Sequence, residues 1–283
     1  MRLLLLCPQW GQEHLPVDRF LSNVKEAGYD GVETWMPESA AGRKELISLL
    51  GTYNLPVVSH QHQASGKDIQ SFCRSFEYYL NVSLECAPLF INSHSGRDYF
   101  TLDEQLQVLD VAANFSVKTG INVYHETHRG RMFFSPGNAA ALFGARPDVK
   151  VTADLSHWVC VTENLQLTGF ENVLAEAIQK TAHIHARVGF EEGPQVTDPR
   201  LPEWQKELHV FLALWDQMIQ HQAANGAAVI TLTPEFGPFP YMWQMPGTKE
   251  PVASQWDINI YMKTLLKERY HSSKITNQLH QPT

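Results

Sequence analysis

The sequence has few cysteines and few basic residues for its length. Its four cysteines are scattered and form no CxxC pair, so neither a zinc knuckle nor a disulfide framework is indicated, and free thiols are expected. Lysine and arginine total 22 against 30 aspartates and glutamates, which gives a net charge of −8, and no basic run occurs. This charge argues against sequence-independent binding to nucleic acid, and no nucleic-acid partner is expected.

Long hydrophobic runs are also absent. The N-terminal segment "MRLLLLCPQW" has four leucines, fewer than a secretory signal needs, and it lacks a small-residue cleavage site. It is instead predicted to be a first buried strand. No apolar segment is long enough to span a membrane, so we expect a cytoplasmic protein with no membrane partner. Residues 1–270 are predicted to form one domain, and the polar ending "HSSKITNQLHQPT" (271–283) a loose tail.

Short apolar runs alternate with helical patterns along the chain. The runs are rich in Val, Ile, Leu and Thr and follow turn residues, as buried strands do. Units of about 35 residues favour a single-domain (β/α)8 TIM barrel of the α/β class, and a doubly wound open sheet is the alternative. The eight predicted strands are 3–7, 31–35, 56–60, 88–94, 121–127, 149–154, 182–187 and 228–235.

Helical patterns fill the segments between these runs. Apolar stripes predict helices around 17–24, 102–117, 208–215 and 256–265. In "TLDE", Thr101 and Glu104 predict a capping box, in which each side chain accepts a free backbone N–H of the first turn. The stretch "GFEEGPQVTDPRLPEW" (189–204) has no helical or strand period and is rich in Gly and Pro. It is predicted to be a functional loop, as long loops in compact domains often are.

Each apolar run begins apolar and ends in polar side chains. Glu126 ends the fifth run, Asp154 the sixth, His183 and His185 the seventh, and Glu235 the eighth. In a barrel, and equally in an open sheet, such ends converge on one mouth. Several carboxylates in a dry mouth are costly unless a cation neutralises them, and a divalent cation also binds neutral imidazole. The sequence therefore predicts one divalent metal ion, Mn²⁺, Mg²⁺, Co²⁺ or Zn²⁺.

More ordinary roles are open to the same residues. A strand-end carboxylate such as Glu126 is commonly a helix cap or the ion-pair partner of an arginine, here Arg129 or Arg131. A histidine in an apolar strand, such as His183, is commonly a hydrogen-bonded core residue. The strand-end histidines His60, His62 and His94 are open to a loop role. The metal interpretation is favoured by the coincidence of acid, acid, imidazole and acid at four consecutive strand ends, which packing alone does not explain.

Four motifs occur in a fixed order: a glutamate on strand five, "DLSH" (154–157), "HAR" (185–187) and "TPEF" (233–236). This order resembles the sugar-phosphate isomerase/epimerase superfamily. These xylose-isomerase-like TIM barrels include ketose 3-epimerases, hydroxypyruvate isomerase, inosose dehydratase and the apurinic endonucleases. "GYDGVETW" (28–35) is similar to the family's second-strand signature, and the resemblance covers nearly the whole chain.

The resemblance implies a ligand set and a group of substrate contacts. His185 is preferred to His183 as the ligand because it lies nearer the strand end. The ketose epimerases carry a glutamate three residues after this histidine, where the present chain has Val188, so membership of that subgroup is not implied. The implied metal ligands are Glu126, Asp154, His185 and Glu235. The candidate substrate contacts are His157, Arg187, His94, His60, Trp35 and His128.

Together these features predict a metal-dependent isomerase or epimerase of a small sugar or hydroxy-keto compound. Glu126 and Glu235 would be both ligands and proton carriers, acting through a metal-stabilised enediolate. A metal-dependent dehydratase is the alternative, because dehydration begins with the same proton abstraction. A non-catalytic sugar-binding barrel is less favoured, as is a nuclease with His94 and His60 or His62 as further ligands. The expected partner is a small-molecule substrate, and a homo-oligomer is possible.

The segment "HETHRGR" (125–131) concentrates ionisable groups after the fifth run. Strand alternation places Glu126 and His128 on one face and His125 on the other, so packing is predicted for His125. Arg129 and Arg131 are each open to two roles, anchoring the loop or meeting an anionic substrate.

Overall fold

Eight parallel strands form a closed barrel, which confirms the predicted (β/α)8 fold over the open sheet. The computed structural model describes residues 2–270, and the predicted tail at 271–283 lies outside them. The strands pair in chain order, and β1 closes the barrel by pairing with β8. Their bounds are β1 Arg2–Pro8, β2 Gly31–Thr34, β3 Val57–Gln61, β4 Ile91–Ser93, β5 Val123–Glu126, β6 Val151–Ala153, β7 Thr181–His185 and β8 Val229–Thr233.

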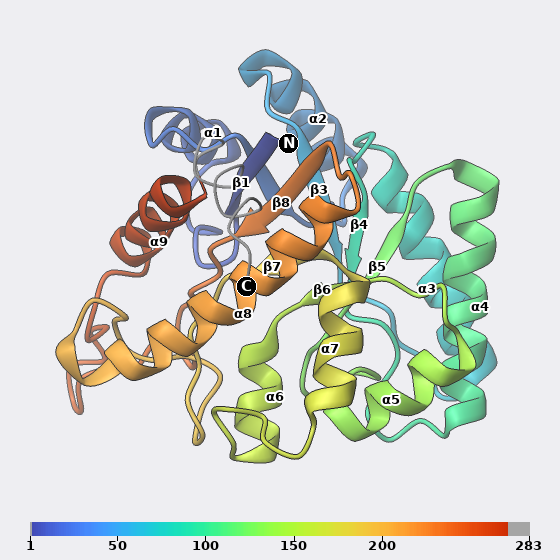
Figure 1. Ribbon diagram of the computed structural model, residues 1–283. Helices are drawn as coiled ribbons and strands as arrows, with labels where there is room; N and C mark the ends of the chain where they lie inside the picture. Colours follow the sequence, from blue (N-terminus) through green and yellow to red (C-terminus); the bar gives the residue numbers. More distant parts are fainter. Residues whose placement is uncertain (1, 271–283) are drawn as a thin grey trace.

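The helices surround the strands (Figure 1), and two of them, α6 and α7, follow β6. Among residues 2–270, no helix combines the length and the hydropathy needed to cross a membrane. The helices are α1 Val17–Glu26, α2 Ala40–Tyr53, α3 Ile69–Leu84, α4 Leu102–Thr119, α5 Pro136–Ala145, α6 Leu155–Thr162, α7 Glu171–Lys180, α8 Gln205–Ala224 and α9 Gln255–Arg269, with a 3-10 turn η1 at Pro202–Trp204.

The predicted capping box begins α4. Thr101 Oγ1 accepts from the backbone N–H of Glu104 at 3.3 Å, and Glu104 Oε2 accepts from the backbone N–H of Thr101 at 2.8 Å. These two bonds satisfy N–H groups that a helix leaves free at its start. The capping prediction is therefore confirmed, and it fixes where the chain leaves the loop after β4.

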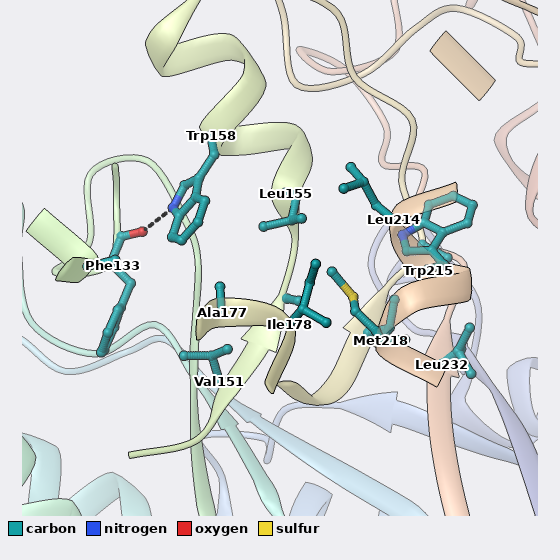
Figure 2. Packing of buried hydrophobic residues seen from close by; sticks show 14 of the residues in the cluster. Phe133, Val151, Leu155, Trp158, Ala177, Ile178, Leu214, Trp215, Met218 and Leu232 are labelled. Carbon is teal, nitrogen blue, oxygen red and sulfur yellow. Dashed lines mark hydrogen bonds between the residues drawn. The ribbon is translucent and has the colours of Figure 1, made fainter. Parts of the chain in front are cut away.

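An apolar layer between strands and helices fixes the position of α6, whose N-cap residue is Asp154. Trp158 of α6 is fully buried, and its Nε1 donates to Phe133 O at 2.9 Å. Ile178 of α7 and Met218 of α8 belong to the same buried cluster (Figure 2). Burying a large apolar side chain contributes about 1.5–3 kcal/mol. This packing holds α6 against the barrel and so sets the position of its first turn at the barrel mouth.

Inside the barrel, side chains lie in layers because alternate residues of each strand point inward. The lowest layer is mainly apolar, with Leu4, Leu6 and Val58 packed together. Toward the carboxyl ends of the strands the inward residues become polar. From the β4 and β5 segments, three successive pairs are in contact: Phe90 with Tyr124, Asn92 with Glu126, and His94 with His128.

The predicted loop at 189–204 packs against the barrel rather than extending into solvent. Phe190 and Gly193 form an isolated bridge, and residues 202–204 form η1. Gln195 is buried, and its side chain bonds both the N–H and the carbonyl of Gly237 at 2.7 and 3.1 Å. The loop therefore braces the segment that follows β8 at the barrel mouth.

Candidate active site

A pocket of about 400 Å³ opens at the carboxyl ends of the strands. Most of its walls come from residues that end strands or directly follow them, as expected for a TIM barrel. Both charged and aromatic side chains contribute to it. Its lining residues are Trp10, Glu13, Trp35, His60, His62, His94, Glu126, His128, Arg131, Arg187, Glu235 and Tyr241.

Glu126 lies at the centre of the pocket floor. Its Oε2 accepts from Asn92 Nδ2 at 3.0 Å and lies 3.1 Å from His94 Nε2. Its Oε1 is buried without a hydrogen-bond partner and lies 3.6 Å from His185 Nδ1. Burial alone would raise the pKa of Glu126, but the neighbouring His94 and His185 imidazoles hold it well below its ordinary value. Glu126 is therefore an ionised carboxylate with one free oxygen.

His185 joins three carboxylates. Its Nδ1 lies 2.9 Å from Glu235 Oε2 and 3.6 Å from Glu126 Oε1, while its Nε2 lies 3.0 Å from Glu33 Oε1. Burial alone would lower the pKa of His185, yet the Glu235, Glu33 and Glu126 carboxylates raise it well above its ordinary value. The ring requires a positive charge beside Nδ1, either its own proton or a cation.

Glu33, at the end of β2, lies beneath this group and was missed by sequence reasoning. It is 4% exposed and contacts four polar side chains. Burial alone would raise the pKa of Glu33, but His185 and His183 hold it well below its ordinary value. The same polar strand ending that marked the other sites is present in "GVETW" and could have identified it. Its partners are Asn92 at 2.9 Å, His183 at 3.1 Å, His185 at 3.0 Å, and the Thr233 hydroxyl.

Asp154 is engaged on both carboxylate oxygens. Oδ1 caps α6 by accepting the Ser156 N–H at 3.1 Å, and Oδ2 pairs with Arg187 Nη2. Burial raises the pKa of Asp154 to about 6, although Arg187 opposes that shift. The ordinary role considered for a strand-end carboxylate, helix capping, is therefore present here, and Asp154 would share Oδ2 between Arg187 and any metal ion.

The structure brings the predicted quartet together. One potential ligand atom from each of Glu126, Asp154, His185 and Glu235 lies within 4.8 Å of the others, and all four are buried. His183 stands outside this group, because its Nδ1 contacts Thr231 and its Nε2 contacts Glu33. His183 belongs to another possible ligand group, with Glu33 and His185, so the choice of His185 over His183 stays a prediction.

A second group of possible ligands shares Glu126. His60 and His94 stand edge to face with ring centres 4.4 Å apart, and their Nε2 atoms lie 3.7 and 3.1 Å from Glu126 Oε2. Burial lowers the pKa of His94 well below its ordinary value, so its imidazole is neutral, the form that binds metals. His60 Nε2 and His94 Nδ1 are buried without hydrogen-bond partners.

Of the other predicted substrate contacts, some line the pocket and one is buried behind it. His128 and Trp35 line the pocket, and Trp35 packs against His62 with ring centres 5.4 Å apart. His157 is fully buried, lies 2.7 Å from Arg187 Nη2, and is not among the pocket-lining residues of the described chain. Its contact with substrate stays a prediction, whereas its contact with Arg187 is observed.

His125 faces away from the pocket, as predicted. It is 3% exposed, its Nδ1 lies 2.7 Å from Ser95 Oγ, and its ring stacks on Phe133. A further pocket residue, Tyr241, lies on the segment after β8 and stands edge to face with Trp10 at 4.9 Å. No sequence period marks Tyr241, because its segment is neither strand nor helix.

The quartet fits a divalent cation. Glu126 Oε1 and His185 Nδ1 are buried and lack hydrogen-bond partners, although they face one another and Glu235. Donation of His185 Nε2–H to Glu33 would leave Nδ1 with its lone pair toward these carboxylates, and a metal ion resolves that repulsion. Three carboxylates and one imidazole suit Mg²⁺, Mn²⁺, Co²⁺ or Zn²⁺.

Comparison with known proteins places the fold. A family model described as a xylose isomerase-like TIM barrel matches residues 21–202, which is more than half of the chain. No curated protein matches the sequence significantly. Among solved structures, the apo form of 3-keto-D-glucoside 4-epimerase from E. coli has a TM-score of 0.61 at 15% identity, covering 94% of this chain and 100% of that one.

Two further structures are similar to a comparable degree. The probable 3-DHS dehydratase from Bacillus anthracis has a TM-score of 0.58 at 14% identity, covering 95% of this chain and 100% of that one. Endonuclease IV from Thermus thermophilus has a TM-score of 0.51 at 14% identity, covering 84% of this chain and 94% of that one. At such identities the likeness shows the fold alone, and three different reactions are named among these structures.

Proposed function

This chain belongs to the xylose isomerase-like TIM barrel family, and on that basis we propose that it is a metal-dependent isomerase or epimerase of a small sugar or hydroxy-keto compound. The proposed ligands are the quartet of Glu126, Asp154, His185 and Glu235. A pocket of about 400 Å³ with aromatic and charged walls suits a small polyhydroxylated molecule.

One observation carries the proposal: two carboxylates stand beside the same ring nitrogen of one imidazole at the pocket floor. Glu126 Oε1 and Glu235 Oε2 lie 3.6 and 2.9 Å from His185 Nδ1, and both glutamates line the pocket. Moving a hydrogen on the carbon beside a carbonyl needs one group that accepts the proton and another that returns it. Two pocket carboxylates from different strands meet that requirement.

The chain's own residues have distinct roles in this proposal. Glu126 accepts the proton, because its lowered pKa keeps it ionised and its Oε1 has no protein partner. Glu235 returns the proton. Arg187 holds Asp154 and His157 in place, and Trp10, Trp35 and Tyr241 exclude water from the apolar side of the pocket. When bound, the divalent ion would supply Lewis-acid polarisation of the substrate carbonyl.

The test is exchange of carbon-bound hydrogen in deuterium oxide. The protein is incubated with Mn²⁺ and a panel of ketoses, hydroxy-keto acids and inososes, and deuterium incorporation is followed by NMR. We expect Glu126→Gln to reduce exchange roughly 10²–10⁴-fold, the range for loss of a general base. The matched control is Glu13→Gln, at the same pocket but in none of the possible metal groups.

The outcome separates the candidate reactions. Exchange with an isomeric product supports the isomerase or epimerase, and loss of water from the substrate identifies the dehydratase instead. A protein that binds the panel members but exchanges no hydrogen with any of them is a binding barrel. Equal exchange by Glu126→Gln and Glu13→Gln would overturn the assignment of the base.

A metal-dependent phosphodiesterase is a second candidate, and the His60, His94 and Glu126 group favours it. A second ion that shares Glu126 with the quartet would create a two-metal centre, which suits displacement at phosphorus. Counting ions per chain by mass spectrometry separates the cases. One ion favours the isomerase or dehydratase, whereas two or more zinc ions would require an assay on abasic DNA.

A further inference from the structure

The two arginines of the loop after β5 have different surroundings. Arg131 is half-buried and lines the pocket. Arg129 is exposed and not among the pocket-lining residues, and its guanidinium lies 5.1 Å from the centre of the Tyr241 ring. Of the two, Arg131 is therefore the one placed to meet a bound molecule.

Among residues 2–270, no hydrogen-bond acceptor contacts the guanidinium of Arg131. Its Nη1 is buried without a hydrogen-bond partner, and no carboxylate of residues 2–270 forms an ion pair with it. A buried donor left unpaired costs about 1–3 kcal/mol, and a charged donor more. An unpaired arginine donor in a pocket wall is satisfied when a bound ligand supplies the hydrogen-bond acceptor.

Arg187 also lines the pocket, but its guanidinium donors already have partners within the protein. Its Nη2 contacts Asp154 and His157, its Nε donates to Ser156 Oγ at 3.3 Å, and its Nη1 lies 3.4 Å from the backbone carbonyl of Glu235. Its donors are directed at the protein. An anionic substrate group would therefore find its free guanidinium donors at Arg131 rather than at Arg187.

The loop holds Arg131 in a defined position. Its backbone N–H donates to His128 O at 3.1 Å, and the next residue, Met132, donates to Ser95 O at 3.2 Å. Met132 and Phe133 are fully buried. Because the backbone is fixed on both sides, little ordering cost accompanies binding at this side chain.

From these contacts we propose that Arg131 binds an oxyanion of the substrate, so that the substrate is a sugar acid, a hydroxy-keto acid or a phosphate ester rather than a neutral sugar. The guanidinium fork matches the geometry of carboxylate and phosphate oxygens. This inference rests on the proposed function for the location of the substrate, and it adds the chemical class that the quartet alone does not specify.

Three ligands of equal chain length test the inference by isothermal titration calorimetry. D-sorbitol is neutral, D-gluconate carries a terminal carboxylate, and D-sorbitol 6-phosphate carries a phosphate. We expect wild-type protein with Mn²⁺ to bind at least one of the two anions about tenfold or more tighter than sorbitol, as a charge-assisted pair predicts. Which anion is preferred identifies the carboxylate or the phosphate as the source.

Two variants of the same loop complete the experiment. Arg131→Gln is expected to bring the ratio of anion to sorbitol affinity close to one, whereas Arg129→Gln removes the same charge outside the pocket and should keep the wild-type ratio. Chelation of Mn²⁺ by gluconate affects all three proteins alike. Circular dichroism verifies that both variants are folded.

Several results would overturn the inference. These are equal affinities of the wild type for the three ligands, no binding of either anion at the highest workable concentration, and an unchanged ratio in Arg131→Gln. Failure of the proposed function is distinguishable from these. Anion selectivity through Arg131 without any hydrogen exchange would contradict the proposed isomerase and support anion binding by Arg131. Hydrogen exchange confined to neutral ketoses would support the isomerase and contradict anion binding by Arg131.

Discussion

Glu33→Gln should weaken metal binding although Glu33 belongs to no predicted ligand set. Its carboxylate contacts His185 Nε2 at 3.0 Å, on the opposite side of the ring from the Nδ1 that faces Glu126 and Glu235. A carboxylate behind a ligand histidine orients the ring and increases its basicity. Loss of such a partner typically costs 10–100-fold in metal affinity, which is about 1.4–2.7 kcal/mol.

The fold should tolerate the Glu33→Gln substitution at a moderate cost in stability. The glutamine amide would direct N–H donors toward His183 or Thr233, so we expect about 1–3 kcal/mol less stability but a folded protein. The assay is Mn²⁺ titration by calorimetry, with thermal unfolding in parallel. Glu207→Gln is the control, since Glu207 is a buried glutamate of α8 outside the pocket. Mn²⁺ affinity within twofold of wild type in a folded Glu33→Gln would refute this reasoning.

Two further outcomes are expected. His185→Asn should lose Mn²⁺ affinity more than His183→Asn, because His183 lies outside the quartet, and the reverse order in calorimetry would show that the ligand is His183. Burial lowers the pKa of His125 from 6.5 to about 3, so below pH 6.5 the unfolded chain binds a proton that the folded protein does not. Stability is then full above pH 6.5 and falls toward pH 3 by about 1.4 kcal/mol per pH unit from this group. Urea unfolding of His125→Gln should show a correspondingly weaker pH dependence than wild type, and identical slopes would contradict it.

The parts of the site that the sequence predicted are those set by strand geometry. Alternation along a strand places Glu126 inward and His125 outward whatever the helices do, and the carboxyl ends of parallel strands meet at one mouth. The eight apolar runs therefore predicted both the barrel and the convergence of the quartet. Six of the eight strands end one or two residues before the predicted end, because polar residues at the mouth leave the ladder, whereas β1 and β3 each end one residue later than predicted.

The parts that the sequence did not predict depend on contacts between distant segments. The polar ending of "GVETW" could mark Glu33 as a residue of the mouth, but nothing in the sequence shows that it contacts His183 and His185 across the barrel interior. Asp154 was predicted as a ligand, but only the start of α6 shows that one of its oxygens also caps the helix. Tyr241 enters the pocket from an aperiodic segment whose path is held by Gly237 and the 189–204 loop.

The charge balance of the mouth leads to a final prediction about metal removal. Arg187 offsets Asp154, but Glu33, Glu126 and Glu235 all surround His185. In metal-free protein a proton on His185 supplies the missing charge, and these carboxylates raise its pKa well above the ordinary value. A raised folded pKa gives stability that is fully present below about pH 6.5 and is lost as pH rises through the folded pKa.

Bound metal replaces that proton, so its stabilising effect should increase with pH. We expect chelator-treated protein to unfold at progressively lower temperature above neutral pH, while protein with saturating Mn²⁺ shows little change over the same range. His185→Asn is the control, because it has no proton to lose and its metal-free form should be less sensitive to alkaline pH. If metal-free wild type and His185→Asn lose stability equally between neutral and alkaline pH, His185 is not the group that balances these carboxylates.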